Sequence, residues 1–474
     1  MTDDATRAPK KAGFWAIALY ATSMNFSIRW LATGAATGPV ALPIWILAAV
    51  LFLVPLLTAT LELSARFPEE GAIYAWTRET QGNFAGFMCG WLYWACNLPY
   101  FASLLYFGVN LVGQALAAWP ATAALGAVIA QPLGAFVASC VVLLIITVMH
   151  TRGFGVGKWL PIVGAAVSIA LALFIVAAAF YLSGRDGSAT HFATASYKLP
   201  SVADGAILWS TMVFAFGGDE GVALMRGEAK NGVKTLIGAL ILLGVFQALM
   251  YAGGTAAMLA IVPQDVASRL GGLPQALNAA MSKLHAAPWF PIVLLCVALS
   301  MLAGLSAWFG AAARLPFAVG IDRMLPKALA YRDPKTGAPS VSLWMQAALT
   351  IPIMALGAAG ASVAGAYDFV VSMGVLTFVI PYLWMFIAYW KVQSRPGEGL
   401  DFRTPGGVNA GRALALLGLL VTVSAILGSM IPSPDAADKL GTFIKLIVAS
   451  AVMIGLGAAI YGVNHFRTRG QAHG

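Results

Sequence analysis

Charged residues are scarce in this chain. Asp, Glu, Lys and Arg together occupy only 10% of its 474 positions, whereas hydrophobic residues occupy 60%. The polar connections between the apolar stretches are short, so they leave no room for a separate soluble domain. This composition excludes a water-soluble globular protein and indicates an integral membrane protein.

Cysteine and histidine are also rare, with four and five residues respectively. The cysteines fall inside apolar segments, and the histidines fall at segment ends, in loops or in the tail. This placement argues against a disulfide framework and a metal site. It also argues against an intramembrane enzyme, which would need a nucleophile and a base at membrane depth. No H-E-x-x-H, paired C-x-x-C or P-loop motif is present, so we expect no cofactor and no enzymatic activity.

Long apolar segments are what the chain has in abundance. A bilayer core is roughly 30 Å thick, and about twelve segments are long enough to cross it. They lie near residues 14–35, 39–63, 84–117, 131–150, 159–182, 205–225, 235–261, 287–313, 342–359, 367–391, 410–431 and 441–463. The sequence therefore predicts an all-α integral membrane fold with about 12 transmembrane helices. We expect the first segment to be a membrane helix and not a cleaved signal peptide, because polar residues interrupt it.

The net charge of +9 is better explained by membrane topology than by nucleic-acid binding. Most of the 28 Lys and Arg residues fall on one side when the N-terminus is placed in the cytoplasm. Cytoplasmic loops of membrane proteins carry such an excess. We expect a multi-pass protein of the cytoplasmic (inner) membrane with both termini cytoplasmic, in contact with lipid and not with nucleic acid.

The segments divide into two similar groups within a single transmembrane domain, residues 1–474. Repeat one covers about 14–182, repeat two covers about 205–391, and two peripheral helices cover about 410–463. Because each repeat has five segments, the second is inverted relative to the first, giving a 5+5 inverted repeat. The sequence does not fix the oligomeric state; a homodimer is one arrangement considered.

Polar residues interrupt the first segment of each group. The first contains N-F-S-I-R at Asn25–Arg29, and the sixth contains F-A-F-G-G-D-E at Phe214–Glu220. Charged groups at membrane depth normally face a water-filled path or each other. Unwound backbone can bind the ionic ends of a ligand, and paired broken helices are typical of carriers. Glycine pairs such as Gly217–Gly218 also serve close helix packing.

Several motifs in the expected order resemble one known family. The run from Glu62 to Tyr74 is similar to E-L-x-x-x-F-P-x-x-G-G-x-Y. Phe216–Glu220 is similar to F-x-G-x-E, and Gly227–Asn231 to G-E-x-x-N. Ser306–Trp308 and Gly320–Pro326 are similar to its small-small-W and D-G-x-L-P runs. Over essentially its whole length, the chain thus resembles the amino acid-polyamine-organocation (APC) superfamily, particularly its glutamate/GABA antiporters and polyamine-uptake carriers.

The resemblance implies a secondary active transporter with broken helices 1 and 6. The unwound G-S-G of helix one in this family corresponds to Asn25-Phe26-Ser27, so two glycines are replaced here. Phe214 and Trp308 fall on aromatic positions that contact substrate, and Asn97 and Tyr100 lie on helix three beside it. The expected substrate-binding residues are Asn25, Phe26, Ser27, Arg29, Asn97, Tyr100, Phe214, Phe216, Gly217, Gly218 and Trp308.

Three charged residues leave alternatives open. Arg29 either clasps a substrate carboxylate or forms a structural ion pair with Asp219 or Glu220. By resemblance, Glu220 is a gating or proton-responsive group, with Asp219 beside it. The alternative is that Glu220 accepts hydrogen bonds from N–H groups freed at the helix break. Ser300 and Ser306 form no distinctive sodium site, so exchange or proton symport is preferred over sodium coupling.

The substrate must be compatible with one cation and two acids near the breaks. An amino acid zwitterion needs the fewest assumptions, and it would move by alternating access. The alternative is a polyamine permease for putrescine or spermidine, since the two acids and aromatic rings suit a polycation. A channel, an enzyme and a nutrient sensor all fit the sequence less well.

Overall fold

The computed structural model describes residues 11–67, 69, 71–193, 197, 200–264, 272–321, 325–358, 377–431 and 439–472. Within these ranges the regular elements are helices, accompanied by one isolated bridge between Ala12 and Ala229. The first half of the chain contains α1 (Phe14–Asn25), α2 (Arg29–Ala35), α3 (Ala41–Ala48), the π-helical η1 (Ala49–Leu53), α4 (Val54–Arg66), α5 (Ile73–Gln81), α6 (Asn83–Ala95), α7 (Asn97–Ala117), α8 (Ala123–Ile129), α9 (Pro132–Thr151), α10 (Phe154–Gly157) and α11 (Trp159–Asp186).

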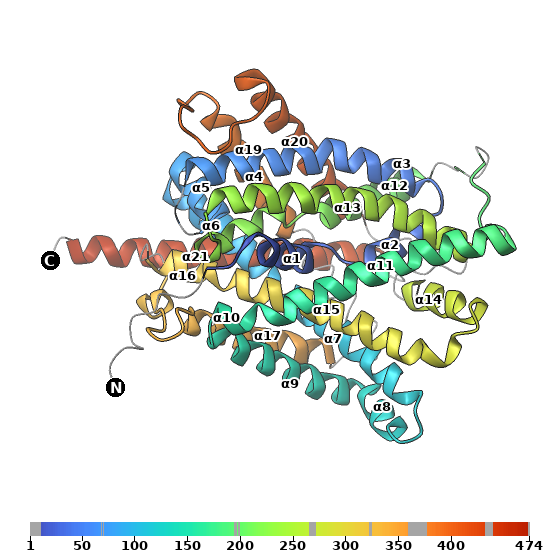
Figure 1. Cartoon of the computed structure of the whole chain (residues 1–474). Coiled ribbons are helices and arrows are strands. Elements are labelled where there is room, and N and C mark those ends of the chain that lie inside the picture. The colour runs from blue at the N-terminus through green and yellow to red at the C-terminus, as the bar shows by residue number, and fades with distance from the viewer. Residues whose placement is uncertain are drawn as a thin grey trace, which may run out of the picture.

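The second half begins with the sixth apolar segment. It contains α12 (Val202–Phe216), the 3₁₀ helix η3 (Asp219–Glu228), α13 (Val233–Ile261), α14 (Gly272–Lys283), η4 (Ala287–Trp289), α15 (Phe290–Ala312), α16 (Arg314–Ile321), η5 (Lys327–Ala330), α17 (Ser340–Ala358), α19 (Pro381–Val392), α20 (Gly407–Ser429) and α21 (Lys439–Ala472). Figure 1 shows these helices as one bundle, with α1 in its middle.

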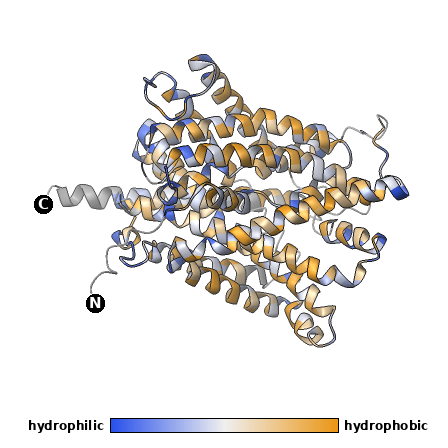
Figure 2. Cartoon of the chain, viewed as in Figure 1, coloured by the Kyte–Doolittle hydropathy of each residue, from blue (hydrophilic) through white to orange (hydrophobic). Residues whose placement is uncertain are grey.

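Helices of this bundle present apolar faces outward. On α9, Leu133, Val137 and Ile145 are 72%, 52% and 54% exposed, whereas Leu143 and Ile146 are buried. Figure 2 shows hydrophobic residues along the helices and hydrophilic ones gathered at helix ends and connections. A helix satisfies its own backbone hydrogen bonds, so such faces suit contact with lipid.

Seven helical stretches in the described ranges are long and apolar enough to cross a membrane. They are Ala41–Arg66, Asn83–Ala117, Pro132–Thr151, Phe154–Asp186, Val233–Ile261, Ala287–Val319 and Gly407–Ser429. The first and sixth predicted segments are interrupted, and residues 367–376 of the tenth, near 367–391, lie outside the described residues. The all-helical membrane fold is thus established, while the number of spans and the two inverted repeats stay predictions.

The first interruption separates α1 from α2. Helix α1 ends at Asn25, and Phe26 is extended, with φ −88° and ψ 120°. The Asn25 carbonyl, left without a helical partner, accepts hydrogen bonds from Gln247 Nε2 and the Tyr251 hydroxyl, both at 3.2 Å. Helix α13 therefore supplies the partners that the broken helix lacks.

The second interruption separates α12 from η3. Gly217 is extended and Gly218 has φ +109°, a conformation that glycine adopts far more readily than other residues. The Gly218 N–H donates to the Tyr382 hydroxyl at 2.8 Å. The Tyr251 hydroxyl also lies 3.4 Å from the Ala215 carbonyl. One side chain of α13 thus contacts the backbone at both interruptions.

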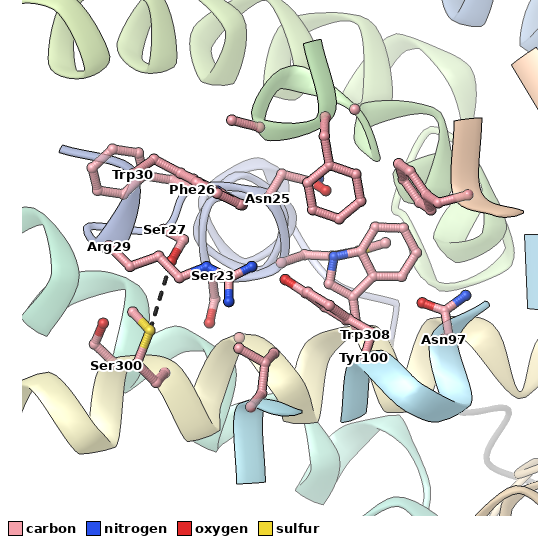
Figure 3. Close-up of a pocket in the computed structure, with 18 of the residues that line it drawn as sticks. Ser23, Asn25, Phe26, Ser27, Arg29, Trp30, Asn97, Tyr100, Ser300 and Trp308 are labelled. Carbon is pink, nitrogen blue, oxygen red and sulfur yellow. Dashed lines mark hydrogen bonds between the residues drawn. The ribbon is translucent and has the colours of Figure 1, made fainter. Parts of the chain in front are cut away.

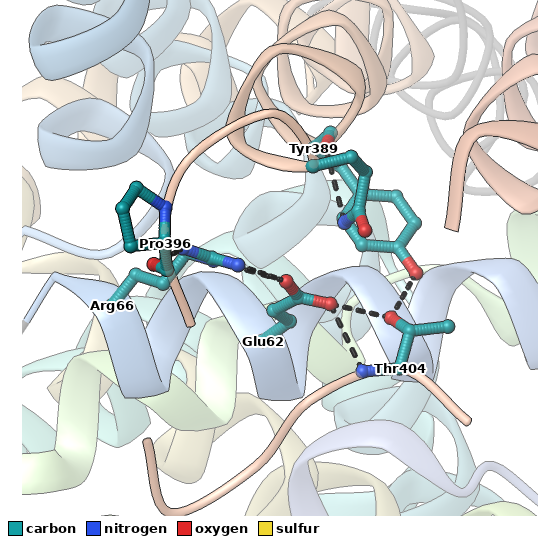
Figure 4. Close-up of polar contacts among 6 residues, drawn as sticks. Glu62, Arg66, Tyr389, Pro396 and Thr404 are labelled. Carbon is teal, nitrogen blue, oxygen red and sulfur yellow. Dashed lines mark hydrogen bonds and ion pairs between the residues drawn. The ribbon is translucent and has the colours of Figure 1, made fainter. Parts of the chain in front are cut away.

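A buried ion pair ties α4 to the segment before α20. Arg66 donates to Glu62 Oε1 from Nε at 2.9 Å and from Nη2 at 2.7 Å. The other carboxylate oxygen accepts hydrogen bonds from the backbone N–H and the hydroxyl of Thr404. Figure 4 shows this network, which Tyr389 extends by contacting the Thr404 hydroxyl. Residues far apart in sequence are thereby fixed together near the end of the bundle.

Candidate functional site

A cavity of about 50 Å³ lies beside the two helix interruptions. This is the volume open to the centre of a water-sized sphere, and one water molecule needs roughly 10–15 Å³ of it. The space therefore has room for a few waters or a small solute. The lining residues come from α1, α2, α7, α12, α15, the two interruptions, the junction of α6 and α7, and the segment before α19. They are Ser23, Met24, Asn25, Phe26, Ser27, Arg29, Trp30, Cys96, Asn97, Tyr100, Leu104, Phe214, Ala215, Gly217, Ser300, Met301, Gly304, Trp308 and Phe378.

The predicted substrate-binding residues line this cavity, with the exception of Phe216 and Gly218. Successive helical residues are about 100° apart, so Phe214 and Phe216 point to nearly opposite sides of α12. The Phe216 ring packs away from the cavity against Trp45 and Tyr251, with ring centroids 5.5 and 5.3 Å apart. Gly218 instead provides the turn at the break.

Arg29 brings a positive charge to the cavity. It is the first residue of α2 and is only 7% exposed. Its guanidinium carbon lies 4.3 Å from the centre of the Trp30 ring and 5.5 Å from that of Tyr100. Figure 3 shows the side chain pointing toward Tyr100. The two rings stabilise the cation without neutralising it.

The structural ion pair considered from the sequence is not formed. Among the described residues, neither Asp219 nor Glu220 is within 4 Å of the Arg29 guanidinium. Both acids are fully buried and neither lines the cavity. The cation and the two acids therefore occupy separate environments.

Aromatic rings form one wall of the cavity. Phe214 packs edge-on against Phe378 and Trp30, with centroids 5.0 and 5.7 Å apart. Trp308 packs edge-on against Phe378 at 6.5 Å. Such edge-to-face contacts fix ring orientation while presenting π faces or edges to a ligand.

Small polar groups also line the cavity. The Ser300 and Ser168 hydroxyls lie 2.9 Å apart, and the Ser27 hydroxyl contacts the Met301 sulfur at 3.6 Å. The Asn97 amide donates to the Tyr93 carbonyl at 2.6 Å. Within the described chain, no group of three His, Cys, Asp or Glu side chains is placed to hold a metal ion.

Glu220 lies behind the cavity as the centre of a hydrogen-bond network. Its Oε1 accepts from the hydroxyls of Tyr93 at 2.6 Å and Tyr382 at 2.8 Å. Its Oε2 accepts from the freed Gly218 N–H at 3.3 Å. Glu220 thus accepts a hydrogen bond from an N–H group freed at the helix break, as one of the two alternatives for this residue predicted. Through the two tyrosines it also connects the break to α6 and α19.

Several residues of the site were not identified from the sequence. Trp30 and Phe378 line the cavity, and Tyr251, Gln247 and Tyr382 hold the interruptions. Adjacency to Arg29 was a usable signal for Trp30. The others lie far away in the chain, so no local motif marks them.

Comparison with known proteins agrees with this architecture. The profile described as amino acid permease matches residues 13–458. The chain belongs to this family. It is therefore a transporter of the APC superfamily, embedded in a membrane and acting on a small molecule, and it is not an enzyme.

Individual relatives of this amino acid permease family member are distant but extend along most of the chain. An uncharacterized transporter of Legionella pneumophila is 25% identical over 87% of this chain and 88% of its own length. The inner membrane transporter YjeM of Escherichia coli is 24% identical over 84% and 85%. A glutamate/gamma-aminobutyrate antiporter of Lactococcus lactis is 22% identical over 81% and 76%.

Proposed function

We propose that this permease moves amino acids across the cytoplasmic membrane by alternating access, as an exchanger or a proton-coupled symporter. The observation that supports this best is the charge of the cavity. Arg29 is the one formally charged side chain on its described lining, and the buried acids lie elsewhere. A ligand with a carboxylate fits such a cavity.

An amino acid uses each part of this lining. Its carboxylate pairs with the Arg29 guanidinium, which can form two parallel hydrogen bonds to it. Its ammonium group lies against the aromatic wall formed by Phe214, Trp308 and Phe378 and near carbonyls of the interrupted helices. The small volume and the apolar contacts of Met24 and Leu104 favour a compact side chain.

Alternating access follows from the interruptions. We infer two inverted repeats, at about 14–182 and 205–391, with both termini cytoplasmic and the helices near 410–463 at the periphery. The broken first and sixth helices then move together relative to the rest of the bundle. The backbone at both breaks supports this movement, because side chains of other helices hold it by hydrogen bonds. Such bonds can be replaced by others when the broken helices move.

A polyamine permease is the less favoured alternative. Putrescine and spermidine carry only positive charges at neutral pH, so Arg29 would repel them. The acids expected to attract them, Asp219 and Glu220, do not line the cavity. A polyamine would therefore enter a lining whose described part offers it no carboxylate.

Binding to purified protein tests the proposal directly. Thermal stability in detergent is measured with each common amino acid, GABA, putrescine and spermidine, because a ligand of the folded state raises stability by mass action. An amino acid that stabilises the protein is then compared with the amine of identical side chain, such as leucine with isopentylamine. Counterflow in liposomes shows whether the bound compound is transported.

Substitution of Arg29 tests its role. A hydrogen bond to a charged group contributes about 1.5–3 kcal/mol, so Arg29→Ala should weaken amino acid binding about 10- to 100-fold. Binding of the matched amine should be unchanged or improved. Arg29→Lys keeps the charge and should retain part of the affinity, and Arg185→Ala, which alters an exposed arginine, is the control. Equal loss of both ligands in Arg29→Ala, or stabilisation by polyamines alone, would contradict the proposal.

A further inference from the structure

Two neighbouring acids at the start of η3 differ completely in their hydrogen bonds. Asp219 and Glu220 are both 0% exposed. Glu220 accepts three hydrogen bonds, from Tyr93, Tyr382 and the Gly218 N–H. In the described part of the chain, neither carboxyl oxygen of Asp219 has a donor. One of the two sites is built for a carboxylate, and the other is not.

The surroundings of Asp219 contain a further acceptor that lacks a donor. The side chain next to it is Gln247, whose Oε1 has no hydrogen-bond partner among the described residues. One N–H of Gln247 Nε2 donates to the Asn25 carbonyl at 3.2 Å, and its second N–H forms no hydrogen bond to either carboxyl oxygen of Asp219. An ionised Asp219 would add two more buried acceptors, whereas a protonated Asp219 can donate to the Gln247 oxygen. Leaving such buried groups without hydrogen bonds destabilises the folded state.

Like-charge repulsion gives the same result. Two adjacent carboxyl groups in a buried site do not both ionise readily, so one of them holds a proton. The elements packed around η3 provide no described cation within 4 Å of either acid. The titratable or charged side chains on η3 and on the elements packed against it are, besides the two acids, Arg226 and Glu228 on η3, Tyr20 on α1, Glu62 and Arg66 on α4, Lys234 and Tyr251 on α13 and Cys296 on α15. Tyr93 on α6 and Tyr382 on α19 reach Glu220.

We propose that Asp219, and not Glu220, is the proton-binding site of this transporter. Asp219 holds a proton in the state seen here and releases it when the interrupted helices move, while Glu220 stays ionised and holds the break. The chain Asp219–Gln247–Asn25 links the sixth-helix break to the first-helix break, so the proton is coupled to the cavity between them. The coupling of this proton to amino acid transport rests on the proposed function, whereas the presence of the proton on Asp219 does not.

Infrared spectroscopy of the purified transporter at neutral pH tests proton occupancy without any substrate. A protonated carboxylic acid has a carbonyl-stretch band distinct from the bands of carboxylates. We expect this band in the unsubstituted protein, its loss in Asp219→Asn and its retention in Glu220→Gln, the adjacent matched control. If a variant does not fold, labelling with ¹³C-carboxyl aspartate should shift the band in the unsubstituted protein, while labelled glutamate should not.

Liposome transport tests the coupling. A pH gradient should drive accumulation of the amino acid in the unsubstituted protein, and Asp219→Asn should lose this accumulation while keeping counterflow. Any one of three results would overturn the assignment. The infrared band is lost in Glu220→Gln instead of Asp219→Asn, the pH gradient still drives accumulation in Asp219→Asn, or transport requires sodium and Asp219→Asn loses this requirement. If no amino acid is transported at all, the proposed function fails, and the infrared result still decides which acid holds the proton.

Discussion

Removal of the Glu62 carboxylate should destabilise the protein strongly. This side chain is 0% exposed and its partner Arg66 only 6% exposed. The carboxylate accepts hydrogen bonds from Arg66 and from both the N–H and the hydroxyl of Thr404. In Glu62→Ala, the Arg66 guanidinium would keep its hydrogen bond to the Pro396 carbonyl but lose its buried counter-charge.

The expected magnitude follows from the burial. Breaking a buried ion pair by removing one partner costs about 3–5 kcal/mol. Glu62→Gln keeps an acceptor of similar shape but loses the charge, so it should cost about 1.5–3 kcal/mol. Glu228→Ala is the control of lower burial, because its pair with Arg314 is 24% and 17% exposed and should contribute less than the Glu62–Arg66 pair.

The assay is the rate of loss of the folded, monodisperse species in detergent at fixed temperature, because unfolding of such proteins is commonly irreversible. Each 1.36 kcal/mol that appears in the unfolding barrier changes the rate tenfold, so a cost of about 3–5 kcal/mol should make Glu62→Ala inactivate roughly two to four orders of magnitude faster. Glu62→Gln should be intermediate. If Glu62→Ala inactivates no faster than Glu228→Ala, burial does not set the strength of this network and the reasoning is refuted.

Two further substitutions test the second interruption. Gly218→Ala would place a Cβ 2.7 Å from both Asn25 Oδ1 and a Trp308 ring carbon, at φ +109°. We expect a cost of about 1–3 kcal/mol from the backbone conformation alone and loss of uptake; Gly187→Ala, at φ +83° in open space, should leave uptake unchanged. Tyr382→Phe removes a donor to ionised Glu220 and should lower thermal stability by about 1.5–3 kcal/mol. Tyr106→Phe, which loses a hydrogen bond to a neutral carbonyl, should cost about 0.5–1.5 kcal/mol, and an equal effect of the two would show that Glu220 carries no charge.

The membrane fold could be predicted from the sequence because hydrophobic length is a strong signal. Polar residues also located the helix interruptions, since Asn25, Ser27 and Arg29 stand out in an apolar segment and Gly217–Gly218 permits a turn. The residues that complete the broken helices could not be predicted in this way. Gln247 and Tyr251 lie within the continuous apolar helix α13, and the Asn25 carbonyl that they share is more than 200 residues away.

The direction in which side chains point explains the remaining differences between the predicted and the observed site. The resemblance placed Phe214 and Phe216 together, but their spacing on α12 puts only Phe214 on the cavity. Asp219 and Glu220 are adjacent in sequence, so on a helix their side chains are expected to point in different directions. The structure separates them, because the hydroxyls of Tyr93 and Tyr382 reach Glu220 alone.

Helix α13 connects the two interruptions through two of its side chains. The Tyr251 hydroxyl lies within hydrogen-bond distance of the Asn25 and Ala215 carbonyls, and Gln247 donates to the former while lying beside Asp219. Movement of either break relative to α13 must therefore replace hydrogen bonds that the other break shares. A proton leaving Asp219 would remove the donor proposed for the Gln247 oxygen and turn an attraction into repulsion at this point. A small change in charge behind the cavity can thus bias the position of both broken helices, although the acid itself does not line the cavity.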